Sequence, residues 1–257
     1  MLLDLHQFHC LLVIMVVIAV VVFVALNFVE AGYGKMISPK WGYAINNKLA
    51  WFLMECPVFI VLFYFWACSP RQWDIAPLLF FIFFEIHYFQ RSFIFPFILK
   101  GKSRMPITIM VMGMVFNTIN GYMQGEWIFF LAPDDMYTVV WLRSPQFIIG
   151  SIMFFLGMVI NISSDHIIRH LRKPGDSKHY LPKQGMYKYV TSANYFGEIT
   201  EWVGFAILTW SLSGMVFAIW TMANLVPRAN SIYKRYKVEF ADEFDEHKLK
   251  RVFPFIY

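Results

Sequence analysis

The basic residues of this chain are confined almost entirely to alternate gaps between long apolar runs. All but three of its 22 Lys and Arg residues fall in four clusters, at residues 35–48, 100–104, 169–188 and 228–251. The exceptions are Arg71, Arg91 and Arg143. Because membrane proteins keep their basic loops on the cytoplasmic side, this alternation predicts an all-α, polytopic membrane protein. We expect seven transmembrane helices, an outer (lumenal or periplasmic) N-terminus and a cytoplasmic C-terminus.

Seven stretches are long and apolar enough to be these helices, since a hydrocarbon core of about 30 Å requires about 20 mostly apolar residues. We place them at about residues 10–28, 49–67, 77–98, 106–124, 146–165, 195–211 and 214–230. The last two form an almost unbroken apolar stretch, which we divide near Leu212. The first has no basic segment before it and no small-residue cleavage site, so it is predicted to be an uncleaved span and not a signal peptide.

Composition favours a single membrane domain over residues 1–257. The chain is 58% hydrophobic and 15% charged, with a mean hydropathy of +0.52, whereas soluble domains are about 25% charged. We expect a cytoplasmic loop at about 166–194 and a cytoplasmic tail at about 231–257. The tail ends in apolar and aromatic residues, so it should pack on the helices or the interface. The membrane would be the endoplasmic reticulum in a eukaryote or the inner membrane in a bacterium.

The positive charge of the chain points to lipid or to an anionic cofactor. The net charge of +5 arises from residues that flank the spans, which argues against a nucleic-acid partner. No obligate protein partner is evident. His166 and His170 lack further histidines to complete a metal site, so no metal is predicted. The sequence also lacks the glycine-rich patterns of Rossmann and P-loop nucleotide sites.

Polar residues inside the predicted spans are the candidates for function, because they are costly in lipid and usually face the bundle interior. Glu55 lies in the second span, and the fourth contains Asn117, Asn120 and Gln124. The third contains Glu85, His87, Tyr88 and Arg91. His87 could equally be a hydrogen-bonded core histidine.

Two sets of polar residues share helix faces at the predicted cytoplasmic ends of their spans. One face has Asn161, Asp165, Arg169 and Arg172, and the other has Asn194, Glu198 and Glu201. Carboxylates and amides recognise hydroxyl and amide groups, and guanidinium groups recognise phosphate. The combination suits a dinucleotide, although an Asp165–Arg169 pair could also be an ordinary interfacial ion pair.

From about Trp51 to its C-terminus the chain resembles the steroid 5-alpha-reductase family. The segments that show the resemblance are AWFLMECP (50–57), HYFQRSF (87–93), GMVINISSDHIIRHLRKPGD (157–176), TSANYFGEITEW (191–202) and the closing PFIY. The resemblance is nearest to the animal-type steroid enzymes. It implies a seven-helix membrane reductase that uses NADPH to saturate the C4–C5 double bond of a 3-oxo-Δ4-steroid such as testosterone or progesterone.

The resemblance also implies roles for individual residues. Glu55 and Tyr88 match the catalytic pair that holds the 3-keto oxygen. Hydride addition to an enone builds negative charge on that oxygen, and a Tyr hydroxyl beside a buried acid that carries a proton can stabilise it. The matching cofactor positions are Asn161, Asp165, Arg169, Arg172, Asn194, Glu198, Arg228 and Tyr236, and we add His179. Candidate substrate-binding residues are Trp51, Arg91, Phe116 and Tyr33.

The chain departs from the family pattern on the presumed cofactor side, at His179-Tyr180 and at residues 230–234. The lipophilic steroid is expected to enter from the bilayer and the cofactor from the cytosol. Three alternatives remain. The first is a reductase whose substrate is another lipid enone, an enoyl-CoA or a polyprenol. The second is a membrane methyltransferase of the isoprenylcysteine type. The third is a seven-span receptor or lipid-binding scaffold.

Overall fold

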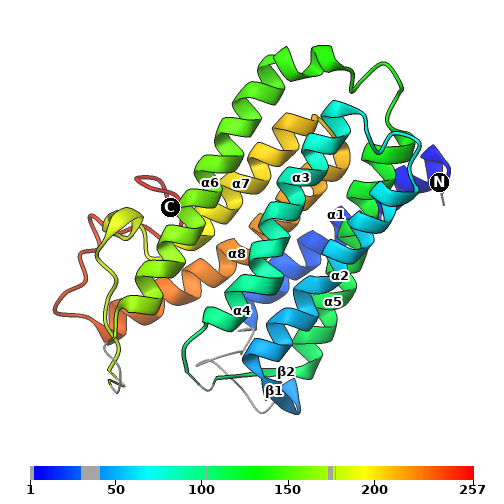
Figure 1. The fold of residues 1–257 in the computed structure, drawn as a ribbon. Coiled ribbons are helices and arrows are strands. Elements are labelled where there is room, and N and C mark those ends of the chain that lie inside the picture. The colour runs from blue at the N-terminus through cyan, green and yellow to red at the C-terminus, as the bar shows by residue number, and fades with distance from the viewer. Residues whose placement is uncertain (1–2, 30–40, 102, 173–175, 177) are drawn as a thin grey trace. The chain divides into compact units, whose positions relative to one another are not determined.

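The computed structural model describes residues 3–29, 41–101, 103–172, 176 and 178–257, and the described chain is mostly helical. Figure 1 shows the long helices. Each of the seven stretches predicted to be a span is helical. The long helices are α1 (Leu5–Phe28), α2 (Asn47–Cys68), α3 (Ile75–Phe89), α5 (Ile107–Glu126), α6 (Pro145–His170), α7 (Ala193–Thr209) and α8 (Leu212–Glu239). The third predicted span continues from α3 through a π-helical turn, η3 (Gln90–Ile94), into α4 (Phe95–Ile98).

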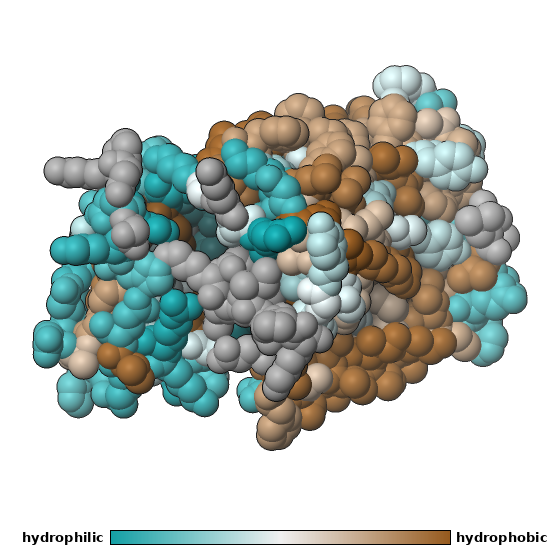
Figure 2. All heavy atoms as spheres, turned by 90° about the horizontal axis from the view of Figure 1, so that it is seen from below, coloured by the Kyte–Doolittle hydropathy of each residue, from teal (hydrophilic) through white to brown (hydrophobic). Residues whose placement is uncertain are grey.

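Four of the described segments are long and apolar enough to cross a membrane: Leu5–Phe28, Asn47–Cys68, Ile75–Ile98 and Pro145–His170. Figure 2 shows hydrophobic residues over long stretches of the molecular surface, as expected for helices that contact lipid. The chain is therefore described as a membrane protein. The count of seven spans and the direction of the termini stay predictions.

Two helix bounds differ from the predicted spans in the same way. α6 continues to His170 and α8 to Glu239, beyond the predicted span ends at 165 and 230. Hydropathy measures only the part of a helix that suits the hydrocarbon core, whereas backbone hydrogen bonding continues into the polar region. The predicted loop at 166–194 is shorter for this reason.

The described chain divides into two compact units. The first contains Met1–Met15, Ala31–Ile148 and Thr209–Gly214, and the second contains Val16–Glu30, Ile149–Leu208 and Met215–Tyr257. The prediction of one domain over the whole chain is not tested by this division.

In the first unit, α2 and α5 start from a two-stranded antiparallel sheet and run side by side (Figure 1). β1 (Ala44–Asn46) leads directly into α2, and β2 (Arg104–Pro106) leads into α5, with Ile45 opposite Met105. Asn46 caps α2, because its side chain accepts a hydrogen bond from Lys48 N at 2.8 Å. This common start fixes which faces of α2 and α5 meet.

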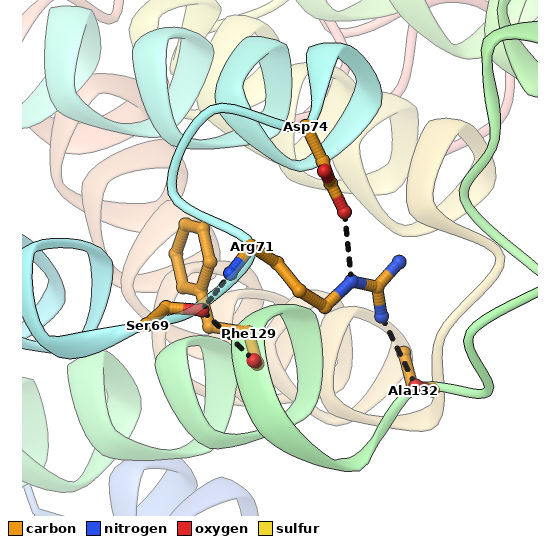
Figure 3. Close-up of polar contacts among 5 residues, drawn as sticks. All are labelled: Ser69, Arg71, Asp74, Phe129 and Ala132. Atoms are coloured by element: carbon orange, nitrogen blue, oxygen red, sulfur yellow. Dashed lines mark hydrogen bonds and ion pairs between the residues drawn. The ribbon is translucent and has the colours of Figure 1, made fainter.

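The opposite end of α2 is tied to the segment after α5 by the contacts in Figure 3. Ser69 Oγ donates to Phe129 O at 3.0 Å and accepts from Arg71 N at 2.9 Å. The Arg71 guanidinium donates to Asp74 Oδ2 and to Ala132 O, both at 3.1 Å. Phe129 belongs to a second π-helical turn, η4 (Trp127–Leu131). The β1–β2 sheet at one end and the α2–α3 connection at the other therefore hold α2 and α5 together at both ends.

In the second unit, α6 and α7 pack antiparallel with their backbones in close contact. A Cβ atom built at Gly157 would lie 2.3 Å from Glu201 N, and one built at Gly197 would lie 2.4 Å from Asn161 N. Gly150 and Gly204 make the same kind of contact one heptad away. Small residues at this spacing allow membrane helices to approach closely. The packing brings Asn161 of α6 against the first turns of α7.

The apolar stretch predicted to be two helices is divided as expected, two residues earlier than Leu212. Trp210 has a positive φ of 49°. Ser211 Oγ then accepts from Gly214 N at 3.0 Å, which caps the start of α8. A left-handed residue ends α7 because its backbone cannot continue a right-handed helix.

Candidate functional site

Glu55 is buried on α2 and is held by an amide from α5. Asn117 Nδ2 donates to Glu55 Oε2 at 3.0 Å and to Met54 O at 2.8 Å. Glu55 and Asn117 are 9% and 4% exposed. A carboxyl in an apolar span requires such partners, because an isolated one is costly. The α2–α5 packing thus supplies the first hydrogen bond to the predicted catalytic acid.

Tyr88 is held by the next polar residue on the same face of α5. Asn120 Nδ2 donates to the Tyr88 hydroxyl oxygen at 3.4 Å. Gln124 Nε2 in turn donates to Asn120 Oδ1 at 3.2 Å and to Ser213 O at 3.0 Å. Asn117, Asn120 and Gln124 are spaced i, i+3 and i+7, so one helix face serves both members of the predicted catalytic pair. We call these three residues the α5 amide row.

The residues after Tyr88 form the π-helical turn η3, which is uncommon and frequent at functional sites. Arg91 in this turn is buried, and its guanidinium carbon lies 4.9 Å from the Trp51 ring centre and 4.4 Å from that of Phe95. The structure therefore joins Arg91 and Trp51, two of the predicted substrate-binding residues. Phe116 is partly buried on α5 beside Asn117. Tyr33 lies outside the described residues.

The predicted cofactor residues of α6 and α7 meet in the second unit. Asn161 Nδ2 donates to Asn194 O at 3.0 Å and lies 3.5 Å from Glu198 Oε2. Asn194 Nδ2 donates to Asp165 Oδ1 at 3.1 Å. Asn161 and Asp165 are 3% and 6% exposed. These four residues form one network, which we call the amide–carboxylate network.

Tyr187 joins this network and was not predicted from the sequence. It lies in the 3₁₀ turn η6 (Gly185–Lys188), is 1% exposed, and its hydroxyl donates to Asn194 Oδ1 at a long 3.5 Å. Burial, and next the nearby Asp165 and Tyr236, hold the pKa of Tyr187 well above its usual range. Its hydroxyl therefore remains a donor at neutral pH. The loop before α7 offered no periodic signal that could have identified it.

The three predicted arginines of the second unit differ in how far they are buried. Arg169 Nη1 on α6 is buried, and no described residue accepts a hydrogen bond from it. Arg172, just after α6, is exposed, and Arg228 on α8 is partly buried. A buried guanidinium donor without a protein partner fits an anionic group of a ligand.

His179 is paired with the C-terminal end of α8. Its Nδ1 contacts Glu239 Oε1, and Arg235 Nε donates to the other oxygen of that carboxylate at 3.3 Å. Lys183 and Glu243 form a second ion pair between these segments, at 2.7 Å. The structure thus joins His179 to α8, where Tyr236 also lies, and its role toward a cofactor stays a prediction.

The residues of the second unit fit a nicotinamide dinucleotide in chemical character. The amide–carboxylate network offers acceptors for ribose hydroxyls and partners for a carboxamide, and Arg169 offers a buried donor for phosphate. Glu55 and Tyr88 lie in the first unit, whereas the nine predicted cofactor residues lie in the second. The contacts within each unit are specific enough to test separately.

Comparisons with known proteins agree on one family. The family model for 3-oxo-5-alpha-steroid 4-dehydrogenase matches residues 103–257. The chain is 35% identical to the steroid 5-alpha-reductase DET2 of Gossypium hirsutum, over 99% of both chains. It is 38% identical to 3-oxo-5-alpha-steroid 4-dehydrogenase 1 of Mus musculus, over 88% of both chains. It is 36% identical to the protein of that name from Homo sapiens, over 88% of this chain and 86% of the human one. The family is one of oxidoreductases that use a nicotinamide cofactor, and this chain belongs to it.

Proposed function

We propose that this chain uses NADPH to reduce the C4–C5 double bond of 3-oxo-Δ4-steroids to give 5α-3-oxosteroids. The proposal extends to this chain the activity stated in the names of its relatives. One observation of the structure supports it most. Two polar side chains that suit a ketone oxygen, Glu55 and Tyr88, are each held by an amide of the α5 amide row inside an apolar helical unit.

The two side chains differ in what they offer to the 3-keto oxygen. The Tyr88 oxygen accepts from Asn120, so that contact leaves the hydroxyl hydrogen for donation. Glu55 receives a hydrogen bond from Asn117, which fixes one carboxyl oxygen and so orients the other. A donor held in place before charge develops lowers the barrier more than one that must reorganise.

Gln124 orients the Asn120 amide from its other side. It donates to Asn120 Oδ1 and to Ser213 O, so the Asn120 oxygen is occupied and its nitrogen points to Tyr88. A chain of hydrogen-bonded amides restricts the orientation of the side chain at its end, which here is Tyr88. In the proposed mechanism the α5 amide row positions the acid pair, and Arg91, with its cation–π contacts to Trp51 and Phe95, borders the steroid site.

The second unit would hold the cofactor. When bound, NADPH supplies the hydride. Asp165, Glu198 and the two asparagines would bind its hydroxyl and amide groups, and Arg169 and Arg172 would bind its phosphates. These groups come from α6, from the segment just after α6 and from α7, so the affinity should depend on packing within the second unit.

The direct test is turnover by the purified protein in detergent or lipid nanodiscs. With NADPH and progesterone or testosterone, the nicotinamide absorbance should fall, and mass spectrometry should find a product heavier by two hydrogens that co-elutes with the 5α standard and not with the 5β standard. Parallel reactions with medium-chain enoyl thioesters, with a polyprenol, and with an isoprenylcysteine peptide plus S-adenosylmethionine cover the alternatives. Turnover of one of these in place of the steroids would reject the proposal.

A further inference from the structure

The C-terminal segment Lys250–Tyr257 is bound to the chain just before α7 by backbone pairing. Val190 and Lys250 form a parallel bridge. Thr191 N donates to Lys250 O at 2.9 Å, Ser192 N donates to Arg251 O at 3.1 Å, and Lys250 N donates to Tyr189 O at 2.8 Å. The apolar end of the segment also packs on the helices, since buried Val252 clusters with Ile199 and Leu225. The expectation that the tail docks is confirmed.

Arg251 joins this pairing to α8. Its Nε donates to Asn230 Oδ1 at 2.8 Å. Its guanidinium carbon lies 4.7 Å from the ring centres of both Tyr233 and Tyr257. A planar guanidinium between two aromatic rings gains from cation–π attraction, and its hydrogen bond fixes the plane. We call Arg251, Asn230, Tyr233 and Tyr257 the tail clamp.

The tail clamp accounts for one departure from the family pattern. Asn230 and Tyr233 lie in residues 230–234, where the sequence departs from the family pattern on the presumed cofactor side. In the structure their side chains contact Arg251. These two positions therefore serve the tail.

The segment that the clamp holds lies between two members of the amide–carboxylate network. Residues 189–192 follow Tyr187 and precede Ala193, the first residue of α7, with Asn194 next. Tyr187, Val190 and Ala193 form one buried cluster. Thr191 Oγ1 adds a fourth hydrogen bond to the tail, to Arg251 O at 3.1 Å. A shift of this segment would move Tyr187 and Asn194 relative to Asp165, which lies on α6.

We propose that Arg251 is a positioning residue for the cofactor site, acting through residues 189–192 on Tyr187 and Asn194. This inference rests on the proposed function, because it assigns the network to NADPH. It predicts that loss of the Arg251 side chain weakens cofactor binding without any contact between that side chain and the cofactor.

The test compares Arg251→Ala with Lys237→Ala in the full-length protein. Lys237 is a matched control, because it also links α8 to the C-terminal region, through Glu246 at 2.8 Å, but both partners are about half exposed. Such surface pairs contribute little. NADPH dissociation constants are measured by fluorescence on the folded fraction isolated by gel filtration. Arg251→Ala should raise the constant about tenfold, which corresponds to about 1.4 kcal/mol, and Lys237→Ala should leave it nearly unchanged.

Two further measurements distinguish positioning from general destabilisation. Without cofactor, hydrogen exchange at the amides of residues 189–196 should accelerate in Arg251→Ala and not in Lys237→Ala, while amides of α2 and α5 exchange as before. Asn230→Ala should also weaken NADPH binding. The double variant of Arg251 and Asn230 should lose less binding free energy than the sum of the two single variants, since both single changes remove the same interaction. Arg251→Lys should be intermediate, because it keeps the charge and loses the planar group.

The outcomes separate the inference from the proposed function. If Asp165→Asn weakens NADPH binding but Arg251→Ala does not, or if Lys237→Ala has an equal effect, the positioning role is wrong and the proposed function stands. If the unaltered protein does not bind NADPH, the proposed function fails and the inference fails with it.

Discussion

Asn117 in the first unit and Asn161 in the second make the same pair of contacts. Each amide lies near a carboxylate and donates to a backbone carbonyl on the neighbouring helix. The partners are Met54 O and Glu55 for Asn117, at 2.8 and 3.0 Å, and Asn194 O and Glu198 for Asn161, at 3.0 and 3.5 Å. An amide between two helices satisfies a carboxylate that lipid cannot solvate.

The helix contacts beside these two asparagines differ. On α5, a Cβ atom built at Gly113 would meet the Met54 side chain, at 2.4 Å from its Cγ. On α6 and α7, Cβ atoms built at Gly157 and Gly197 would meet backbone nitrogens. A methionine side chain can change rotamer, whereas a helix backbone must move as a body. At these positions the α6–α7 contact is therefore tighter than the α2–α5 contact.

The comparison predicts that a change at Glu55 affects catalysis and leaves cofactor binding intact. Glu55→Gln keeps the shape of the side chain but removes its acid. We expect kcat to fall about 100- to 1,000-fold, the usual cost of losing one preorganised group, with the KM for NADPH nearly unchanged. Glu126→Gln is the control, because Glu126 is a buried acid of the same unit that accepts from Leu3 N at 3.3 Å. An equal loss of turnover and cofactor binding would refute the assigned role.

The difference in helix contact predicts unequal effects of adding one methyl group. Gly157→Ala forces backbone apart and should lower the stability by about 3 kcal/mol, the upper part of the range for overpacking. Gly113→Ala requires only a shift of Met54 and should cost less than about 1 kcal/mol. Thermal unfolding in one detergent measures both. Equal shifts in Tm would mean that the α2–α5 contact is as rigid as the α6–α7 contact.

A change in the amide–carboxylate network should have the opposite kinetic signature to Glu55→Gln. Asp165→Asn removes the charge that accepts from Asn194 Nδ2 at 3.1 Å. We expect the KM for NADPH to rise about 10- to 100-fold, in line with hydrogen bonds to charged groups, with a smaller change in kcat. The exposed Asp242 provides the control variant, Asp242→Asn. A fall in kcat alone would remove Asp165 from the cofactor site.

Helical periodicity and hydropathy predicted much of this arrangement. The seven helices and the shared faces with Asn161 and Asp165, and with Asn194 and Glu198, followed from spacing alone. Asn117 and Asn120 were visible as polar residues in a span, but their pairing with Glu55 and Tyr88 was not. That pairing depends on which faces of α2, α3 and α5 meet, and this is set by packing and by the β1–β2 start.

Other parts of the candidate site have no periodic signal. The turn with Tyr187 and the tail with Arg251 gain their positions from contacts with segments that are distant in sequence, such as Asn230 and Thr191. The π-helical turn at Arg91 likewise arises from a local register change that hydropathy does not reveal. Sequence patterns thus located the helices that carry the candidate site better than they located the turns and the tail that contact those helices.

Tyr187 allows the smallest effect to be tested. Tyr187→Phe removes one long hydrogen bond to Asn194 and should weaken NADPH binding by about 2- to 10-fold, equivalent to about 0.5–1.5 kcal/mol. The raised pKa of Tyr187 also predicts the direction in which the stability of the protein changes with pH. Because the folded protein favours the neutral phenol, Tyr187 contributes its full stability below pH 10, the ordinary tyrosine value, and loses it as pH rises above that. The unaltered protein should therefore lose stability more steeply above pH 10 than Tyr187→Phe, measured by chemical unfolding. Parallel curves for the two proteins would show that Tyr187 ionises as freely in the folded as in the unfolded chain.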